Sequence, residues 1–200
     1  NFGVGGYGGY QSLLMLEKVF NNKDKIKLVF YGFIPHHEMR NTAAGSWMYL
    51  LNFFSKRGFI SLPYGSVDKK NKLIKHKPIT YITLPLGKKS ALIAKIEKRI
   101  MKIRSLFREK KQKEISLAII EEMNKLSLEN NSKFVLLILE EFHDTRSNEY
   151  YSFLKNKNIP YIKCVMPQGQ EYVVAGDGHP NELSHNEIGE CINQKIKLNN

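Results

Sequence analysis

Asp177 and His179 are the two residues whose types and spacing most directly suggest chemistry. They are two positions apart in the segment D-G-H-P-N, residues 177–181, where the intervening glycine lets a carboxylate turn back toward the neighbouring imidazole. Such a contact fixes the tautomer of the histidine and leaves its other nitrogen basic, as in the orienting acid and general base of a nucleophilic triad. The structural alternative is that Asp177 caps the helix that follows and His179 only fills the loop.

The glycine-rich opening of the chain is the second candidate. Gly3 to Gly8 match the pattern G-x-G-x-x-G, which is typical of dinucleotide-binding loops. That function also needs a preceding strand and an acidic residue at the end of the next strand. Neither is found, because the next predicted strand ends in Y-G-F, residues 31–33. Nucleotide binding is therefore the least favoured function, although the glycines still indicate a close approach of the backbone to another group.

His36 and His37, with Glu38 and Arg40 beside them, directly follow a predicted strand, where loops of parallel sheets often line pockets. Adjacent histidines chelate one metal ion poorly, and the spacings HxH and HxxxH are absent, so we expect no metal site. The only two cysteines, residues 164 and 191, form no CxxC motif. They can pair only if the fold brings them together, and two separate thiols are the favoured interpretation.

The elements that must position these residues alternate along the chain. Strands are predicted over 26–33, 133–139 and 159–165, with a further possible strand over 79–84. Helices are predicted over 11–20, 47–54, 88–128 with a possible break at 108–114, 148–155, and 180–196 with Pro180 in the first turn.

This alternation predicts an α/β fold: a three-layer α/β/α sandwich with a parallel, flavodoxin-like sheet. We expect a single domain over residues 1–200, with an insertion at 42–87. Since a glycine loop that leads into a helix normally follows a strand, we expect the first strand to be missing.

Composition narrows the class of protein. The 200 residues are 42% apolar, and no uninterrupted apolar segment is long enough to span a bilayer. Lys and Arg number 31 against 19 Asp and Glu, which gives a net charge of +12. The densest basic stretch, residues 95–113, alternates with apolar residues at helical spacing, so a solvated helix face is favoured over a nucleic-acid site. No cofactor is indicated, and the cellular compartment is left open.

Taken together, the opening N-F-G-V-G-G-Y-G-G-Y-Q and the closing D-G-H-P-N-E-L-S-H-N-E-I-G-E resemble the SGNH hydrolases, also called the GDSL esterase/lipase family. The resemblance implies a serine esterase that acts on a small-molecule or carbohydrate ester, such as an O-acetyl group, by hydrolysis or transfer. It implies Asp177 and His179 as acid and general base, Gly6 as a backbone donor of the oxyanion hole, and Asn1 as a residue that shapes this loop. His185 would have a supporting role.

The sequence departs from the family pattern in two places. The G-D-S block that carries the nucleophilic serine is absent, so we expect a chain truncated before the nucleophile and nearly inactive alone. Where the family has G-x-N-D after the second strand, this sequence has Y-G-F-I-P-H-H-E, so His36 or His37 would replace the asparagine as oxyanion donor, unless that donor is missing. The alternative function is a noncatalytic binding protein on the same scaffold that holds a polyanion with its lysine-rich helix face.

Overall fold

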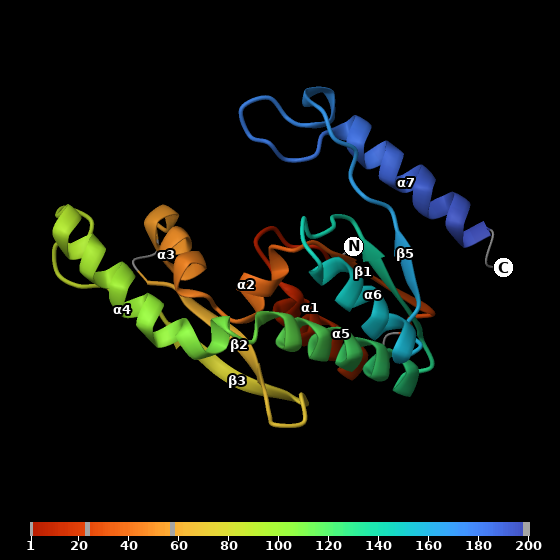
Figure 1. Cartoon of the computed structure of the whole chain (residues 1–200), viewed down its shortest axis with the longest axis horizontal. Helices are drawn as coiled ribbons and strands as arrows, with labels where there is room; N and C mark the ends of the chain where they lie inside the picture. The colour runs from red at the N-terminus through yellow and green to blue at the C-terminus, as the bar shows by residue number, and fades with distance from the viewer. Residues whose placement is uncertain (1, 23–24, 57–58, 198–200) are drawn as a thin grey trace. The chain divides into compact units, whose positions relative to one another are not determined.

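The computed structural model describes residues 2–22, 25–56 and 59–197 (Figure 1). Within the chain two compact units are distinguished: unit 1 combines Asn1–Lys25 with His36–Leu126, and unit 2 combines Ile26–Pro35 with Ser127–Asn200. The chain is α/β, as the alternation of patterns predicts. In the described ranges, no helix combines the length and apolar character needed to cross a membrane.

Unit 2 contains a parallel sheet of three strands. The strands are β1 (Leu28–Phe33), β4 (Lys133–Ile138) and β5 (Tyr161–Lys163), in the spatial order β1-β4-β5. Leu28 pairs with Lys133, and Leu136 pairs with Tyr161. The strands predicted over 26–33 and 133–139 are confirmed with slightly shorter bounds, whereas only 161–163 of the strand predicted over 159–165 is strand. Their short apolar runs after turn residues are typical of strands that are buried in a parallel sheet.

Two helices pack against this sheet. The ring of Phe33 in β1 lies 6.1 Å from that of Phe142 and 5.0 Å from that of Tyr150, which belongs to α6 (Arg146–Asn156). Residues of α7 (Glu182–Lys197) pack around Leu137 and Ile162; they recur at helical spacing and are Ile188, Cys191, Ile192 and Ile196. The helix predicted over 180–196 is confirmed, but Pro180 lies outside it, in a bridge with Val173.

Cys164 and Cys191 form a disulfide, with their Cα atoms 5.8 Å apart. The interpretation of two separate thiols is therefore wrong. Cys164 is buried directly after β5, and Cys191 lies on the face of α7 that packs against the sheet. The packing of α7 on the sheet thus brings together two residues that are 27 positions apart in the sequence. The bond closes a loop that contains Asp177 and His179.

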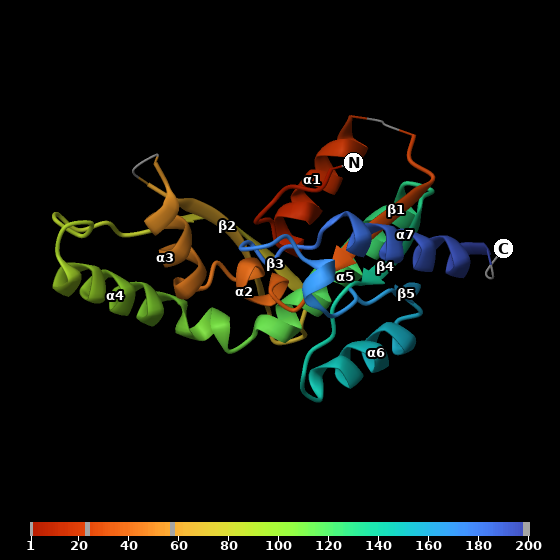
Figure 2. The same ribbon diagram turned by 90° about the horizontal axis from the view of Figure 1, so that it is seen from above.

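Unit 1 is built around helices α1 (Gly9–Asn21), α2 (His37–Asn41), α3 (Gly45–Phe54), α4 (Ala91–Glu109) and α5 (Gln112–Glu129), the last of which belongs to unit 1 up to Leu126. The expected break in the helical stretch lies at 110–111, between α4 and α5. Figures 1 and 2 show α3 beside α4. Their contact is close at Gly45, where a Cβ would lie 2.8 Å from the backbone of Met101, so any larger residue would push the two helices apart.

A hairpin of β2 (Ser61–Val67) and β3 (Leu73–Thr80) completes unit 1 and lies in the segment where we expect an insertion. The strand predicted over 79–84 is largely wrong, because β3 begins at Leu73 and ends at Thr80. Asp68 closes the turn: its Oδ1 accepts from the amides of Lys70 and Lys72 at 2.8 and 2.9 Å. The hairpin covers a core of Ala43, Met48, Tyr81 and Met101.

The face that α4 buries is not its most apolar one. Its apolar residues Leu92, Ile96, Ile103 and Phe107 follow helical spacing but are 68%, 41%, 57% and 85% exposed. The buried positions are instead Glu97, Met101 and Ser105. Glu97 is satisfied there, since its carboxylate accepts from the Leu84 amide at 2.6 Å and from the Tyr81 hydroxyl at 3.3 Å.

Candidate functional site

The glycine-rich opening of unit 1 forms a tight turn. The amide of Tyr7 donates to the carbonyl of Val4 at 3.2 Å, and Gly6 has a φ of +80° at the third position of this turn. That conformation is typical of a type II turn and favours glycine. The next glycine, Gly8, precedes α1, and its amide donates to Oε1 of Gln11 at 3.1 Å. The turn is therefore formed by contacts within residues 4–11, and it places backbone amides near the start of α1.

Three side chains hold this turn from outside it. Arg40 donates through Nη1 to the carbonyl of Tyr7 at 3.1 Å, and its guanidinium lies over the ring of Trp47, 4.7 Å from the centroid. A Cβ on Gly6 would lie 3.7 Å from Cζ2 of that ring. Asn41 accepts from the amide of Tyr10 at 2.9 Å and donates to Ser116 at 2.8 Å. The first turn of α1 is thus fixed by α2 and α3.

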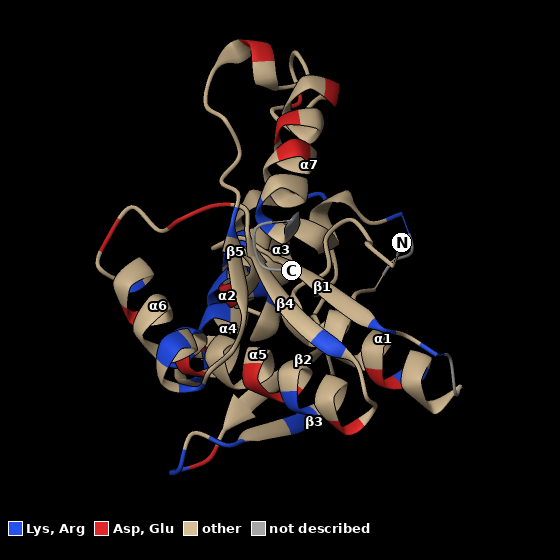
Figure 3. Ribbon diagram, turned by 90° about the vertical axis from the view of Figure 1, so that its right-hand side faces the viewer, with Lys and Arg blue, Asp and Glu red and all other residues tan. Residues whose placement is uncertain are grey.

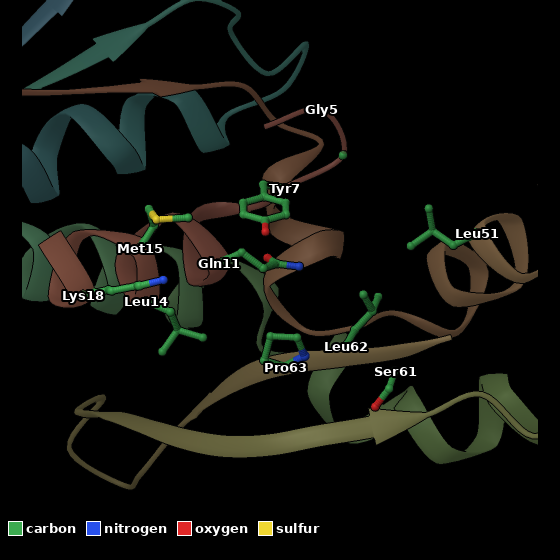
Figure 4. A pocket seen from close by; sticks show the side chains of 11 residues that line it. Gly5, Tyr7, Gln11, Leu14, Met15, Lys18, Leu51, Ser61, Leu62 and Pro63 are labelled. Carbon is green, nitrogen blue, oxygen red and sulfur yellow. The ribbon is translucent and has the colours of Figure 1, made fainter. Parts of the chain in front are cut away.

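A pocket of about 470 Å³ opens beside the glycine turn. Figure 4 shows Leu51 facing it from α3, and Leu62 and Pro63 from β2. The glycine turn and α1 supply the rest of its lining: Gly5, Gly6, Tyr7, Gln11, Leu14, Met15 and Lys18, with Ser61 at the start of β2. Most of the lining surface is apolar, with Gln11, Lys18 and Ser61 as its polar side chains, so the pocket suits a largely apolar group.

His36 and His37 lie at the start of α2 in unit 1, where the sequence suggested a loop. His36 is exposed, whereas His37 is half-buried. Burial, together with the positive charges of Arg40 and His36, lowers the pKa of His37 to about 3. His37 is consequently neutral near pH 7, when one ring nitrogen donates and the other accepts. It can therefore offer a hydrogen bond without carrying a charge.

In unit 2, Asp177 and His179 are joined by a hydrogen bond of 2.6 Å between Oδ1 and Nδ1. This is the contact that the two-residue spacing suggests. Both side chains are solvent-exposed, 58% for Asp177 and 77% for His179. No hydrogen bond to Nε2 of His179 is found among the residues that the structure describes. Through Nδ1 the carboxylate orients the ring, and Nε2 is the nitrogen that remains for proton transfer.

The loop that carries this pair is closed by short-range contacts. Val174 donates to the carbonyl of His179 at 2.8 Å, and the amide of Asp177 donates back to Val174 at 3.1 Å. Asn181 caps α7, because its Oδ1 accepts from the amide of Ser184 at 3.2 Å, so Asp177 is not the cap. The side-chain amide of Asn181 also donates to Glu171 at 2.6 Å.

The surroundings of the pair are acidic although the chain as a whole is basic. Between Lys163 and Lys195 the sequence has no Lys or Arg, and its five acids are Glu171, Asp177, Glu182, Glu187 and Glu190. Figure 3 shows acidic positions without basic ones over the first part of α7 and the loop before it. This part of unit 2 therefore disfavours an anionic ligand.

The structure places the predicted site residues in two groups. Asp177 and His179 are in contact in unit 2; Gly6, His36 and His37 belong to unit 1; and Asn1 lies outside the described residues. Among the described residues, no group of three His, Cys, Asp or Glu side chains is arranged to hold a metal ion.

The roles of Asn41 and Trp47, and the contacts of Arg40 with Tyr7 and Trp47, were not predicted from the sequence. The available signal was position, since Arg40 and Asn41 lie only three and four residues after His37.

Comparisons with known proteins add no relative. No protein-family model, no curated protein and no solved structure matches this sequence.

Proposed function

We propose that this chain supplies the general base and the oxyanion-stabilising loop of an SGNH-type serine hydrolase that cleaves or transfers an acyl ester, on a flavodoxin-like three-layer scaffold. The observation that carries the proposal is the 2.6 Å bond between Asp177 and His179 on a glycine-containing loop directly before the last helix. The glycine turn at the opposite end of the sequence supports it, because both segments carry the residues of the family pattern. The identity of the family rests on that resemblance.

In the proposed mechanism each group has a defined part. Nε2 of His179 takes the proton from the attacking serine hydroxyl and later gives it to the leaving alkoxide. Asp177 holds the ring in the tautomer that makes this possible. The amide of Gly6 stabilises the oxyanion of the tetrahedral intermediate, and the neutral His37, or His36, is the candidate second donor. No residue of this chain is assigned as the nucleophile.

The substrate class follows from the pocket beside the glycine turn. An apolar lining around Gly5 and Gly6 suits the uncharged acyl part of an ester, with the acetyl group of a carbohydrate ester as the smallest case. A series of nitrophenyl esters, from acetate to octanoate, measures how much of the pocket is used. A rise in kcat/KM with chain length would indicate that the acyl chain binds in this pocket. A preference for acetate would indicate that the pocket binds the alcohol part of the ester.

The decisive experiment measures ester hydrolysis by the full-length natural gene product that contains this sequence. His179→Ala is expected to lower kcat by about 10⁴-fold or more, because the base of a catalytic triad acts as a unit with the nucleophile. The matched control is His143→Ala, which removes another exposed histidine of unit 2. Equal activity of the two variants would exclude the proposal. The 200 residues alone are expected not to react with a fluorophosphonate probe.

The second candidate is a noncatalytic protein that binds a polyanion through α4. Six basic residues lie on this helix, and three of them, Lys95, Arg99 and Lys102, have no partner in the described part of the chain. Binding of heparin or RNA that disappears at moderate salt and ignores His179→Ala would favour this function. Ester hydrolysis that requires His179 would favour the enzyme.

A further inference from the structure

The exposed apolar stripe of α4 is the feature of unit 1 that the proposed hydrolase does not use. We define it as Leu92, Ile96, Ile103 and Phe107, which are separated by four, seven and four residues and so lie along one side of the helix. Phe107 is 85% exposed and Leu92 68% exposed. A continuous exposed stripe of this kind marks an interaction surface, whereas single exposed apolar residues are ordinary.

The opposite side of α4 is already occupied. Glu97 accepts hydrogen bonds from Leu84 and Tyr81, Met101 is fully buried, and the hydroxyl of Ser105 receives the amide of Gly45 at 3.1 Å. The helix therefore cannot rotate to bury the stripe without breaking these contacts. The apolar side is held outward by the packing of unit 1 itself.

A basic band borders the stripe. Lys95, Arg99 and Lys102 follow one another at spacings of four and three residues, which places them next to Leu92 and Ile103 on the helix surface. All three are exposed, and in the described part of the chain they have no partner. The two acids of α4 do not offset them, because Glu97 is buried and Glu109 accepts from Gly45 at 2.9 Å.

We infer that α4 is an interfacial helix by which this protein lies on an anionic lipid surface. The stripe would enter the boundary between headgroups and acyl chains, and the basic band would contact the anionic headgroups. Charge complementarity selects this occupant. A nucleic acid would use the band but not the stripe, and an uncharged apolar partner would use the stripe but not the band. The inference does not depend on the hydrolase proposal.

The experiment measures how the 200-residue chain partitions onto vesicles of phosphatidylcholine with and without phosphatidylglycerol. We expect binding to the anionic vesicles, weak binding to the neutral ones, and a loss of binding as salt rises. Leu92→Ser with Phe107→Ser tests the stripe, and Lys95→Glu with Lys102→Glu tests the band. Each pair is expected to lower the partition coefficient by about tenfold or more.

Matched controls come from the β2–β3 hairpin. Lys69→Glu with Lys70→Glu makes the same change in charge at an exposed turn, and Ile74→Ser removes an exposed apolar side chain of β3. We expect them to change partition by less than about threefold. All variants replace exposed residues, and circular dichroism confirms that they fold.

Four outcomes would overturn the inference. Equal binding to neutral and anionic vesicles would show that charge has no role. Binding to neither kind of vesicle would show that the chain does not lie on a lipid surface. Sensitivity to the band but not to the stripe indicates a polyanion instead. If the stripe variants convert a dimer to a monomer and leave partition unchanged, the stripe is covered by a second copy of the chain.

Discussion

The guanidinium of Arg40 lies 4.7 Å from the ring centroid of Trp47, while its Nη1 donates to the carbonyl of Tyr7 at 3.1 Å. One side chain of α2 thus connects the glycine turn to α3. The proposed oxyanion donor, Gly6, lies on the same indole ring. The turn is therefore held by a tertiary contact as well as by its own hydrogen bond, and disrupting that contact is expected to loosen it.

Arg40→Met keeps the aliphatic stem but removes the charge and the hydrogen bond to Tyr7. We expect a loss of about 1–2 kcal/mol in the free energy of unfolding and faster amide exchange at Tyr7. Urea unfolding and hydrogen exchange measure the two effects. Arg104→Met is the control, because it makes the same substitution at an exposed arginine whose Nη1 donates to the carbonyl of Thr80 and not to the glycine turn. Unchanged exchange at Tyr7 in Arg40→Met would contradict the role of Arg40.

His37 makes stability depend on pH. Its pKa is about 3 in the folded chain and about 6.5 when exposed, so the unfolded state binds a proton that the folded state does not. The contribution of the neutral His37 to the free energy of unfolding is fully present above pH 6.5 and is lost as pH falls toward 3. Between pH 6.5 and 5 it amounts to about 2 kcal/mol. His37→Asn should reduce the difference in unfolding free energy between pH 7.5 and 5 by that amount, and an identical pH profile for both proteins would contradict the buried, neutral histidine.

The disulfide stabilises unit 2 by closing the loop between β5 and α7. Replacing Cys164 and Cys191 together by alanine is expected to lower the free energy of unfolding by about 3 kcal/mol, since the unfolded chain regains the freedom of the loop. Thermal unfolding with and without a reducing agent checks this. The reductant should lower the Tm of the natural sequence and leave that of the double variant unchanged. A natural sequence that ignores the reductant would show that the bond does not form.

Glu97 is buried on α4 and joins the helix to the segment before it. Glu97→Ala leaves the amide of Leu84 and the hydroxyl of Tyr81 without their acceptor, which is expected to cost about 2–3 kcal/mol. Because burial, and after it the neighbouring Glu97 side chain, raises the pKa of Tyr81, the phenol stays protonated and remains a donor in the natural sequence. Arg99→Ala, two residues along but exposed, is expected to change stability by less than about 0.5 kcal/mol. Equal losses in the two variants would contradict the buried network.

The parts of the fold that could be predicted depend on local pattern. The strands β1, β4 and β5 are short apolar runs after turn residues, and the contact of Asp177 with His179 spans only two positions. The hairpin was missed because β2 contains Pro63 and Gly65 and β3 contains Pro78, residue types that are depleted in strands.

What could not be predicted depends on tertiary contacts. Spacing indicates that α4 has an apolar side, but it does not indicate which side the rest of the unit covers. The disulfide and the contact of Arg40 with Trp47 likewise join elements whose packing no local pattern specifies. The same holds for the low pKa of His37, which arises from burial.

The loop that carries Asp177 and His179 is held together by its own contacts. The bridge between Val173 and Pro180, the bond from Val174 to His179, and the cap of Asn181 on α7 all lie within a dozen residues. The geometry of carboxylate and imidazole is therefore a property of one short peptide rather than of the whole molecule. Substitutions elsewhere in the sequence are therefore expected to leave the contact between Asp177 and His179 unchanged.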